Sequence, residues 1–295
     1  MPNLKDLRLR IGSVRNTQQI TRAMKMVSAA KLRRAQQNIV NLRPYAKKLL
    51  EVIADISVSK RVNHPLLNPV AIQKKVLMVV LTSDRGLCAG FNANINRFAF
   101  RFLQDNRSKY EKMDIMFIGR KGADFFKARK VEAKEAITNL AKDVSYHYAS
   151  QMSARLLESF TDGGYDAIYM IYNEFKSAIA QNVVCEQLLP IDMSKTSFTS
   201  GAAGKSSFSQ DLVFEPAPEL MIDELLQRHF AVQIYRCMCE SVAAEHGARM
   251  TAMENATKNA SDMIRNLTLT YNKLRQASIT TELIEITSGA EALKG

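Results

Sequence analysis

The last seventy-odd residues of the chain have the pattern of one long helix. No proline interrupts the stretch from about Pro218 to Ala290, and Gly247 is the one glycine before its last turn. At ~1.5 Å per residue such a helix is roughly 110 Å long, several times the length of an ordinary globular helix. A small domain cannot bury a helix of that length, so we predict a lever, a spacer or one strand of a coiled coil.

The spacing of this segment favours the coiled coil, because its less polar positions recur in steps of three and four. The predicted seam consists of Met250, Met253, Thr257, Ala260, Ile264, Leu267, Tyr271, Leu274, Ser278 and Thr281. Several of these side chains are small or hydroxylated, where a permanent zipper carries branched aliphatic residues. An ordinary structural coiled coil explains the pattern, and so does a shaft that slides against a partner.

The N-terminal segment, residues 1–57, is the predicted mate. Its apolar residues start on heptad spacing and then shift around the helix, with Leu4, Leu7, Ile11 and Val14 in the first stripe and Ile20, Met24 and Val27 in the second. Pro44 has no amide hydrogen to donate, so we expect it to kink or interrupt the helix. Two long terminal helices around a globular insertion predict an antiparallel coiled coil.

The N-terminal helix is also strongly basic. Between Met1 and Leu50 there are twelve Lys or Arg and one acid, Asp6, so this segment holds +11 of the net charge of +12. A one-sided basic helix implies an acidic partner, which can be nucleic acid, anionic lipid or an acidic protein surface. The first aromatic residue is Tyr45, so the charge has no stacking platform for bases beside it. A coiled-coil protein that binds nucleic acid through phosphates alone is therefore an open alternative.

Residues 75–207 are predicted to form a central Rossmann-like α/β domain. Apolar runs predict strands at 76–81, 114–118 and 166–172, and less clearly at 182–190, with helices at 92–109, 121–129 and 145–160 between them. Strands that alternate with helices indicate a mostly parallel sheet. The Ser/Thr/Gly-rich segment Ser194–Gln210 reads as a loop that leads into the C-terminal helix at residues 218–290. No apolar run approaches the roughly twenty residues of a membrane-spanning helix.

A turn in the central domain is the one place where phosphate chemistry is conceivable. Thr82–Asn92 follows the first strand, but Gly86 and Gly90 fit neither nucleotide-binding fingerprint. We expect a tight turn in which Asp84 or Asn92 caps the next helix, and a nucleotide-dependent enzyme is the second alternative. The four cysteines and four histidines show no metal-ligand spacing, and Cys88 is expected to be buried and inert. We predict neither a metal nor a cofactor.

Three stretches resemble the gamma subunit of F-type ATP synthases, and together they span nearly the whole chain. They are Ile20–Ala35, Ser83–Cys88 and Arg275–Ala290. The resemblance implies a non-catalytic subunit whose terminal helices form the central rotor shaft inside a hexamer of alpha and beta subunits. The α/β domain would sit on the membrane c-ring beside the epsilon subunit. Rotation would couple proton flow to ATP synthesis and hydrolysis, and would regulate both ATPase activity and proton flow.

The family pattern carries over onto six positions, none of which does chemistry. Arg275 and Gln276 resemble the pair that meets the catch loop of a beta subunit. Met24 resembles the shaft position beside the beta lever, where an added positive charge disturbs coupling in relatives. The other matched coupling positions are Arg249, Thr280 and Glu282. The plain alternative for all six is an ordinary helix surface.

The resemblance also implies a location. We expect a peripheral membrane protein on the cytoplasmic face of a bacterial inner membrane, because the chain starts at Met1 with no presequence. The matrix side of the mitochondrial inner membrane is the alternative. Chloroplast-type relatives carry a regulatory pair of nearby cysteines, whereas Cys88 and Cys185 lie far apart in this sequence. Neither nucleic acid nor a small-molecule substrate is an expected partner.

Overall fold

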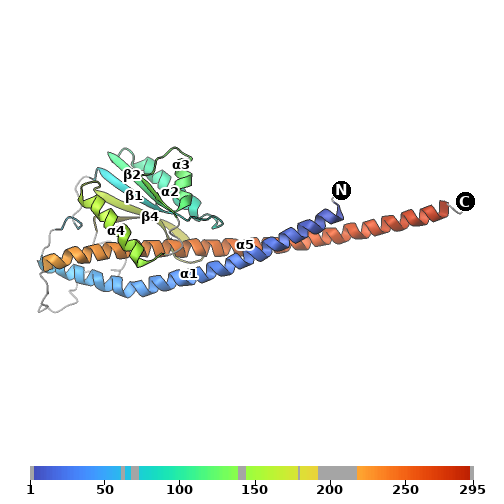
Figure 1. The fold of residues 1–295 in the computed structure, drawn as a ribbon, viewed down its shortest axis with the longest axis horizontal. Helices are drawn as coiled ribbons and strands as arrows, with labels where there is room; N and C mark the ends of the chain where they lie inside the picture. Colours follow the sequence, from blue (N-terminus) through green and yellow to red (C-terminus); the bar gives the residue numbers. More distant parts are fainter. Residues whose placement is uncertain are drawn as a thin grey trace. The chain divides into compact units, whose positions relative to one another are not determined.

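The computed structural model describes residues 3–60, 64–67, 73–138, 144–178, 180–191 and 218–292. The predicted loop Ser194–Gln210 lies outside these ranges. The two longest elements are the helices α1 (Leu4–Lys60) and α5 (Pro218–Ala292) (Figure 1). Contacts divide the chain into two compact units. One consists of Ala29–Ala248, and the other of Met1–Ser28 with Arg249–Gly295.

The larger unit contains a five-stranded sheet in the order β3-β2-β1-β4-β5. The strands are β1 (Lys75–Leu81), β2 (Lys112–Ile118), β3 (Glu135–Ile137), β4 (Ala167–Phe175) and β5 (Gln181–Leu189). The first four pair in parallel, and β5 runs antiparallel to β4. This confirms the mostly parallel Rossmann-like sheet. All the predicted strands form. The structure adds β3, whose three residues, two partly buried and one exposed, gave no strand signal in the sequence.

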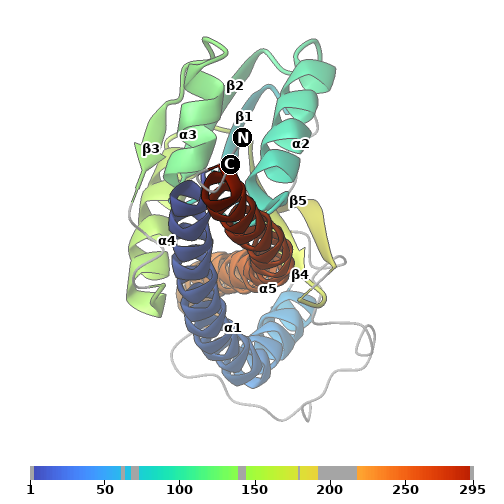
Figure 2. The same ribbon diagram turned by 90° about the vertical axis from the view of Figure 1, so that its right-hand side faces the viewer.

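Three shorter helices complete this unit, and they start and end within a few residues of the predicted positions. They are α2 (Phe91–Asn106), α3 (Arg120–Lys127) and α4 (Tyr146–Thr161). On β1, side chains alternate between two hydrophobic clusters, with Leu77 and Val79 in one and Met78 and Val80 in the other. The Leu77 side packs against α1, α4 and α5, and the Met78 side packs mainly against α2 and α3 (Figure 2).

Pro44 does not interrupt α1, so that part of the prediction was wrong. The proline is exposed, and the helix continues because its next turns are anchored in the core. Leu50 is 2% exposed and Ile53 is fully buried, and burying such side chains contributes about 1.5–3 kcal/mol each. That burial outweighs the one backbone hydrogen bond that the proline removes.

Gly247 is a close-packing position, although its residue type alone made it look like a weak point of α5. A Cβ atom at this residue would lie 3.2 Å from the Phe175 ring and 3.3 Å from the Ala178 Cα. Glycine therefore lets α5 approach the end of β4. Pro218 is the first residue of α5, as predicted, because a proline in the first helical turn loses no hydrogen bond.

Candidate functional site: the paired terminal helices

The smaller unit is an antiparallel helix pair, made by the start of α1 and the end of α5 (Figures 1 and 2). Arg8 Nη2 donates to Tyr271 Oη at 2.7 Å. Lys25 Nζ lies 2.6 Å from Glu254 Oε1. Residue numbers rise along one helix while they fall along the other, which confirms the antiparallel prediction. With this register, Leu4 at the start of α1 comes level with about residue 275 of α5.

The predicted seam of α5 is confirmed over most of its length. Every predicted seam residue from Met250 to Ser278 is at least partly buried, and Met253 and Ala260 are buried fully. Thr281 is the exception, because it is exposed. It lies beyond the level at which α1 begins, so no part of α1 covers it.

The seam of α1 differs from the prediction. The stripe does not shift after Val14 but continues in heptad steps through Thr21 and Ser28, which are 8% and 2% exposed. Ile20 and Val27 lie outside the seam, at 60% and 58% exposure. The small hydroxylated residues fit between closely spaced helices. The Thr21 hydroxyl group donates to the Gln18 carbonyl oxygen and also forms a hydrogen bond with the Thr257 hydroxyl group.

The outer face of α1 in this unit combines positive charge with apolar side chains. Arg10, Arg15 and Arg22 are exposed, and Met26 is 61% exposed beside Val27. Arginine together with exposed apolar side chains is typical of a protein interface rather than of a solvated helix face. The acidic partner expected from the sequence would meet this face.

The six predicted coupling residues do not converge on one point. Met24 is half-buried at the edge of the seam, and Arg249 is 7% exposed. Any role of Arg249 in coupling therefore runs through the packing of the chain itself. Arg275 and Gln276 are exposed and lie roughly 30 Å further along the pair than Met24, at ~1.5 Å per residue.

Near its C-terminal end, α5 brings the remaining predicted coupling residues onto neighbouring turns. Thr280 Oγ1 donates to the backbone carbonyl of Gln276 at 2.9 Å. Ser278 Oγ donates to Glu282 Oε1 at 3.5 Å. Thr280 and Glu282 are both exposed. At 3.6 residues per turn, Arg275 and Glu282 lie on one side of α5 and Gln276 and Thr280 on another, and both pairs are separate from Met24.

An apolar stripe between these two polar pairs was not predicted from the sequence. Ile279, Leu283 and Ile286 follow at i, i+4 and i+7 and are 49%, 58% and 67% exposed. Residues 279–291 are all exposed, and the red end of α5 continues past the N-terminus in Figure 1. The signal was available in the spacing, since these residues recur in steps of four and three beyond the level at which α1 begins.

The turn after β1 is built as a structural element. Asp84 Oδ1 accepts from the Arg120 amide at 3.0 Å and so caps α3, while Asn92 Oδ1 accepts from the Ser83 amide. The expectation that one of these residues caps the next helix, α2, was wrong, because Gly90 is its N-cap and supplies no side-chain bond. Cys88 is buried, as predicted.

The position where a doubly wound sheet holds a nucleotide is filled by α5. Met238 and Glu245 of α5 close over Thr82 and Gly119 and leave a cavity of about 30 Å³. That volume is far below the ~300 Å³ of a small ligand pocket. A Cβ atom on Gly119, whose φ is +108°, would lie 2.0 Å from the Thr82 carbonyl oxygen. The geometry therefore gives the nucleotide alternative no support.

Two further features are absent from the described residues. Within them, no group of three or more His, Cys, Asp or Glu side chains is arranged to hold a metal ion. The helices of that part of the chain also lack an apolar stretch long enough to cross a bilayer.

Comparisons with known proteins agree along the whole chain. A family model described as ATP synthase matches residues 3–293. The ATP synthase gamma chain of Bdellovibrio bacteriovorus is 58% identical over 295 residues, which cover 100% of both chains. The gamma chain of Anaeromyxobacter sp. (strain Fw109-5) is 51% identical over 298 residues, again covering 100% of both.

Solved structures give the same fold. A chain in the central stalk and c-ring structure of Tetrahymena thermophila mitochondrial ATP synthase is 29% identical, with a TM-score of 0.59. The match covers 80% of this chain and 99% of that one. A chain in an OSCP/F1/c-ring structure of Euglena gracilis mitochondrial ATP synthase reaches a TM-score of 0.66 at 23% identity, covering 98% and 94%. The second likeness concerns the fold alone.

Proposed function

This chain belongs to the gamma chains of the ATP synthase family, and on that basis we propose that it is the central rotor shaft of an F-type ATP synthase. It couples proton flow through the membrane sector to ATP synthesis and hydrolysis at the catalytic hexamer. Through the same coupling it regulates ATPase activity and proton flow.

The observation that carries this proposal is the helix pair of the smaller unit. Two helices held by the Arg8–Tyr271 and Lys25–Glu254 contacts form a narrow body, and residues 279–291 of α5 continue as an exposed helix beyond the level at which α1 begins. A rotor that turns inside a ring of subunits needs such a narrow body. Its two sides must differ, so that each rotation angle presents a different surface to a given subunit of the ring. The seam between the helices is weakly apolar, but cross-helix polar contacts tie it together.

The proposed partners on the shaft are the alpha and beta subunits. The basic and apolar face around Arg22 and Val27 suits the acidic lever segments of beta, and Met24 lies at its edge. Arg275 and Gln276 are the proposed contacts of the catch loop, with Thr280 and Glu282 on adjoining turns. Arg249 is proposed to act by holding the local packing, which its burial supports.

The remaining partners would meet the larger unit. We assign the epsilon subunit and the c-ring to that unit, as the resemblance to the family implies; the matched Tetrahymena thermophila chain comes from a central stalk and c-ring structure. The chain would then be a peripheral membrane protein, on the cytoplasmic face in a bacterium. It would do no chemistry itself, which the structural use of Asp84 and Asn92 and the filled position above the sheet support.

Reconstitution tests the proposal. Purified alpha and beta subunits are mixed with and without this chain, and both ATP hydrolysis and the size of the complex are measured. We expect a hexamer-sized assembly with one copy of the chain, together with cooperative ATPase activity that depends on it. If alpha and beta subunits assemble and hydrolyse ATP identically without it and do not bind it, the rotor assignment is wrong.

A further inference from the structure

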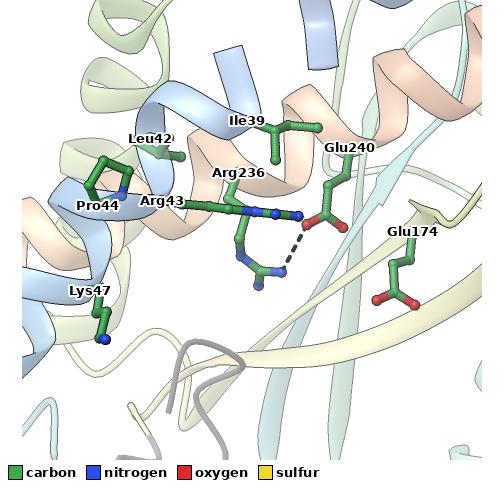
Figure 3. A pocket seen from close by; sticks show the side chains of 8 residues that line it. All are labelled: Ile39, Leu42, Arg43, Pro44, Lys47, Glu174, Arg236 and Glu240. Atoms are coloured by element: carbon green, nitrogen blue, oxygen red, sulfur yellow. Dashed lines mark hydrogen bonds and ion pairs between the residues drawn. The ribbon is translucent and has the colours of Figure 1, made fainter. Parts of the chain in front are cut away.

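A cavity of about 460 Å³ lies within the larger unit, between α1 and α5. Ile39, Leu42 and Pro44 of α1 form its apolar part (Figure 3). Glu240 and Arg236 of α5 and Glu174 of β4 form the opposite part. The volume lies in the range of small-ligand pockets, and the lining combines three apolar side chains with five charged ones. No step of the rotor mechanism uses this cavity.

The charge of Arg236 is already matched. Its Nη2 atom lies 2.6 Å from both carboxylate oxygens of Glu186, and its Nε donates to Gln233 Oε1 at 2.8 Å. Arg236 Nη1 also donates to Glu240 Oε1, at 3.4 Å, and to Tyr172 Oη, at 3.2 Å. One guanidinium nitrogen thus serves both oxygens of Glu186 and another reaches Glu240, so Arg236 divides its charge between two carboxylates.

Glu240 is consequently left with an unmet acceptor. Its Oε2 atom is buried and has no hydrogen-bond partner, and a buried charged acceptor without a partner is costly. Burial raises the pKa of Glu240, Arg236 opposes this rise, and the nearby Glu174 and Glu186 add to it. In Figure 3 the Glu174 and Glu240 carboxylates lie on the same side of the cavity. One carboxylate oxygen of the site, Glu240 Oε2, therefore remains an unmet acceptor.

Besides Arg236, two more cations of the chain border the cavity, Arg43 and Lys47. Lys47 is turned away from Glu174 and Glu240 in Figure 3, and its Nζ lies 3.9 Å from Glu51 Oε1. Arg43 is exposed and extends across the cavity in the same view. Its guanidinium group is the internal competitor for Glu240, although it leaves Oε2 unbonded in this structure.

We propose that this cavity binds a cationic group on an apolar stem, either a guanidinium or a primary ammonium. The charge would meet Glu240 and Glu174, and the stem would pack on Ile39, Leu42 and Pro44. Such a ligand would join α1 to α5 and β4 inside the larger unit. Its source is either a free organic amine or an Arg or Lys side chain of a partner subunit, since both present the same chemistry. The proposal does not depend on the rotor role.

Calorimetric titration of the full chain with n-butylguanidinium tests this site. We expect saturable binding that falls by about 10- to 100-fold in Glu240→Gln, because a charge-assisted hydrogen bond is lost. Glu158→Gln, which removes an exposed carboxylate of α4, should leave binding unchanged. Arg43→Ala should strengthen binding, and the neutral isostere n-butylurea should not bind. Equal binding by the wild type and Glu240→Gln, or no saturable binding at all, would overturn the proposal.

Two further measurements complete the test. Leu42→Trp fills the apolar end of the cavity and leaves Glu240 in place, so we expect it to abolish binding. This variant keeps the proposal testable if Glu240→Gln folds poorly. Folding of each variant is checked by circular dichroism. Repeating the titration on the chain assembled with its partner subunits identifies the source. Loss of binding in the assembly assigns the cation to a partner side chain, and retained binding assigns it to a free amine.

Discussion

The Oγ1 atoms of Thr21 and Thr257 lie 2.8 Å apart across the seam of the terminal helix pair. The contact occupies a position where a stable coiled coil carries aliphatic side chains. Ile20, the neighbour of Thr21, is 60% exposed. The shaft therefore pairs its helices partly through hydroxyl groups and presents apolar side chains outward, which suits a body that packs against surrounding subunits.

We expect Thr21→Val to lower the free energy of unfolding of the helix pair by about 1 kcal/mol, because a partly buried hydrogen bond is lost. Thr21→Val combined with Thr257→Val should cost less than the sum of the two single changes, since neither hydroxyl is then left facing an apolar group. Urea unfolding of the four proteins measures this coupling. Thr270→Val, at an exposed position of α5, is the control, and strictly additive effects would contradict the assigned contact.

Met24→Lys should leave ATP hydrolysis present and impair proton pumping. Met24 is half-buried at the edge of the seam, next to the Lys25–Glu254 ion pair, so the new charge enters a site that already contains a matched pair. The measurement is ATP-driven proton uptake by membranes alongside their ATPase rate. Val40→Lys is the control, because Val40 is 55% exposed on the part of α1 that belongs to the larger unit, away from the proposed contact. Normal pumping by Met24→Lys would remove this residue from the coupling set.

Replacing Ile279, Leu283 and Ile286 by serine should weaken assembly with alpha and beta subunits while leaving the stability of the isolated chain nearly unchanged. The three side chains are mostly exposed in the chain itself, and burying each in a partner is worth about 1.5–3 kcal/mol. Each single change should then reduce affinity by about tenfold or more. Phe98→Ser, at a 37% exposed position in the other unit, serves as control. Unaltered assembly of the triple variant would show that the stripe has no partner.

His229 should make the larger unit acid-sensitive. The side chain is 1% exposed, and burial, with a smaller effect from Arg236, lowers its pKa to about 4. A lowered folded-state pKa means that the unfolded chain takes up the proton first, so stability is complete above pH ~6.5 and falls as pH drops toward 4. This loss amounts to about 3 kcal/mol.

The variant His229→Gln isolates that contribution to acid sensitivity. The difference in unfolding free energy between pH 7 and pH 4.5 should shrink in this variant relative to the wild type. His147→Gln changes an exposed histidine of α4 and should preserve the full difference. An unchanged pH dependence in His229→Gln would show that His229 is not the group responsible.

The strands of the sheet could be predicted from sequence where the signal is local. β1 is six consecutive apolar residues after Lys75, and all six are buried, so any fold that forms must place them inside. β3 lacked such a signal, because its three residues are half-exposed and become a strand only by pairing with β2. The role of Asp84 was predicted wrongly for a related reason. Its carboxylate accepts a hydrogen bond from the backbone amide of Arg120, which is 36 residues away in the sequence.

By itself, the sequence determined the two long helices, the heptad spacing of α5 and the mostly parallel sheet, because periodicity and apolar runs act over a few residues. Tertiary structure alone decided which face of α1 meets α5. Thr21 and Ile20 compete for that seam, and the small hydroxylated residue occupies it because the helices approach closely and Thr257 lies opposite. The unpaired oxygen of Glu240 is likewise a tertiary result, since it follows from Arg236 being held by Glu186 on a distant strand.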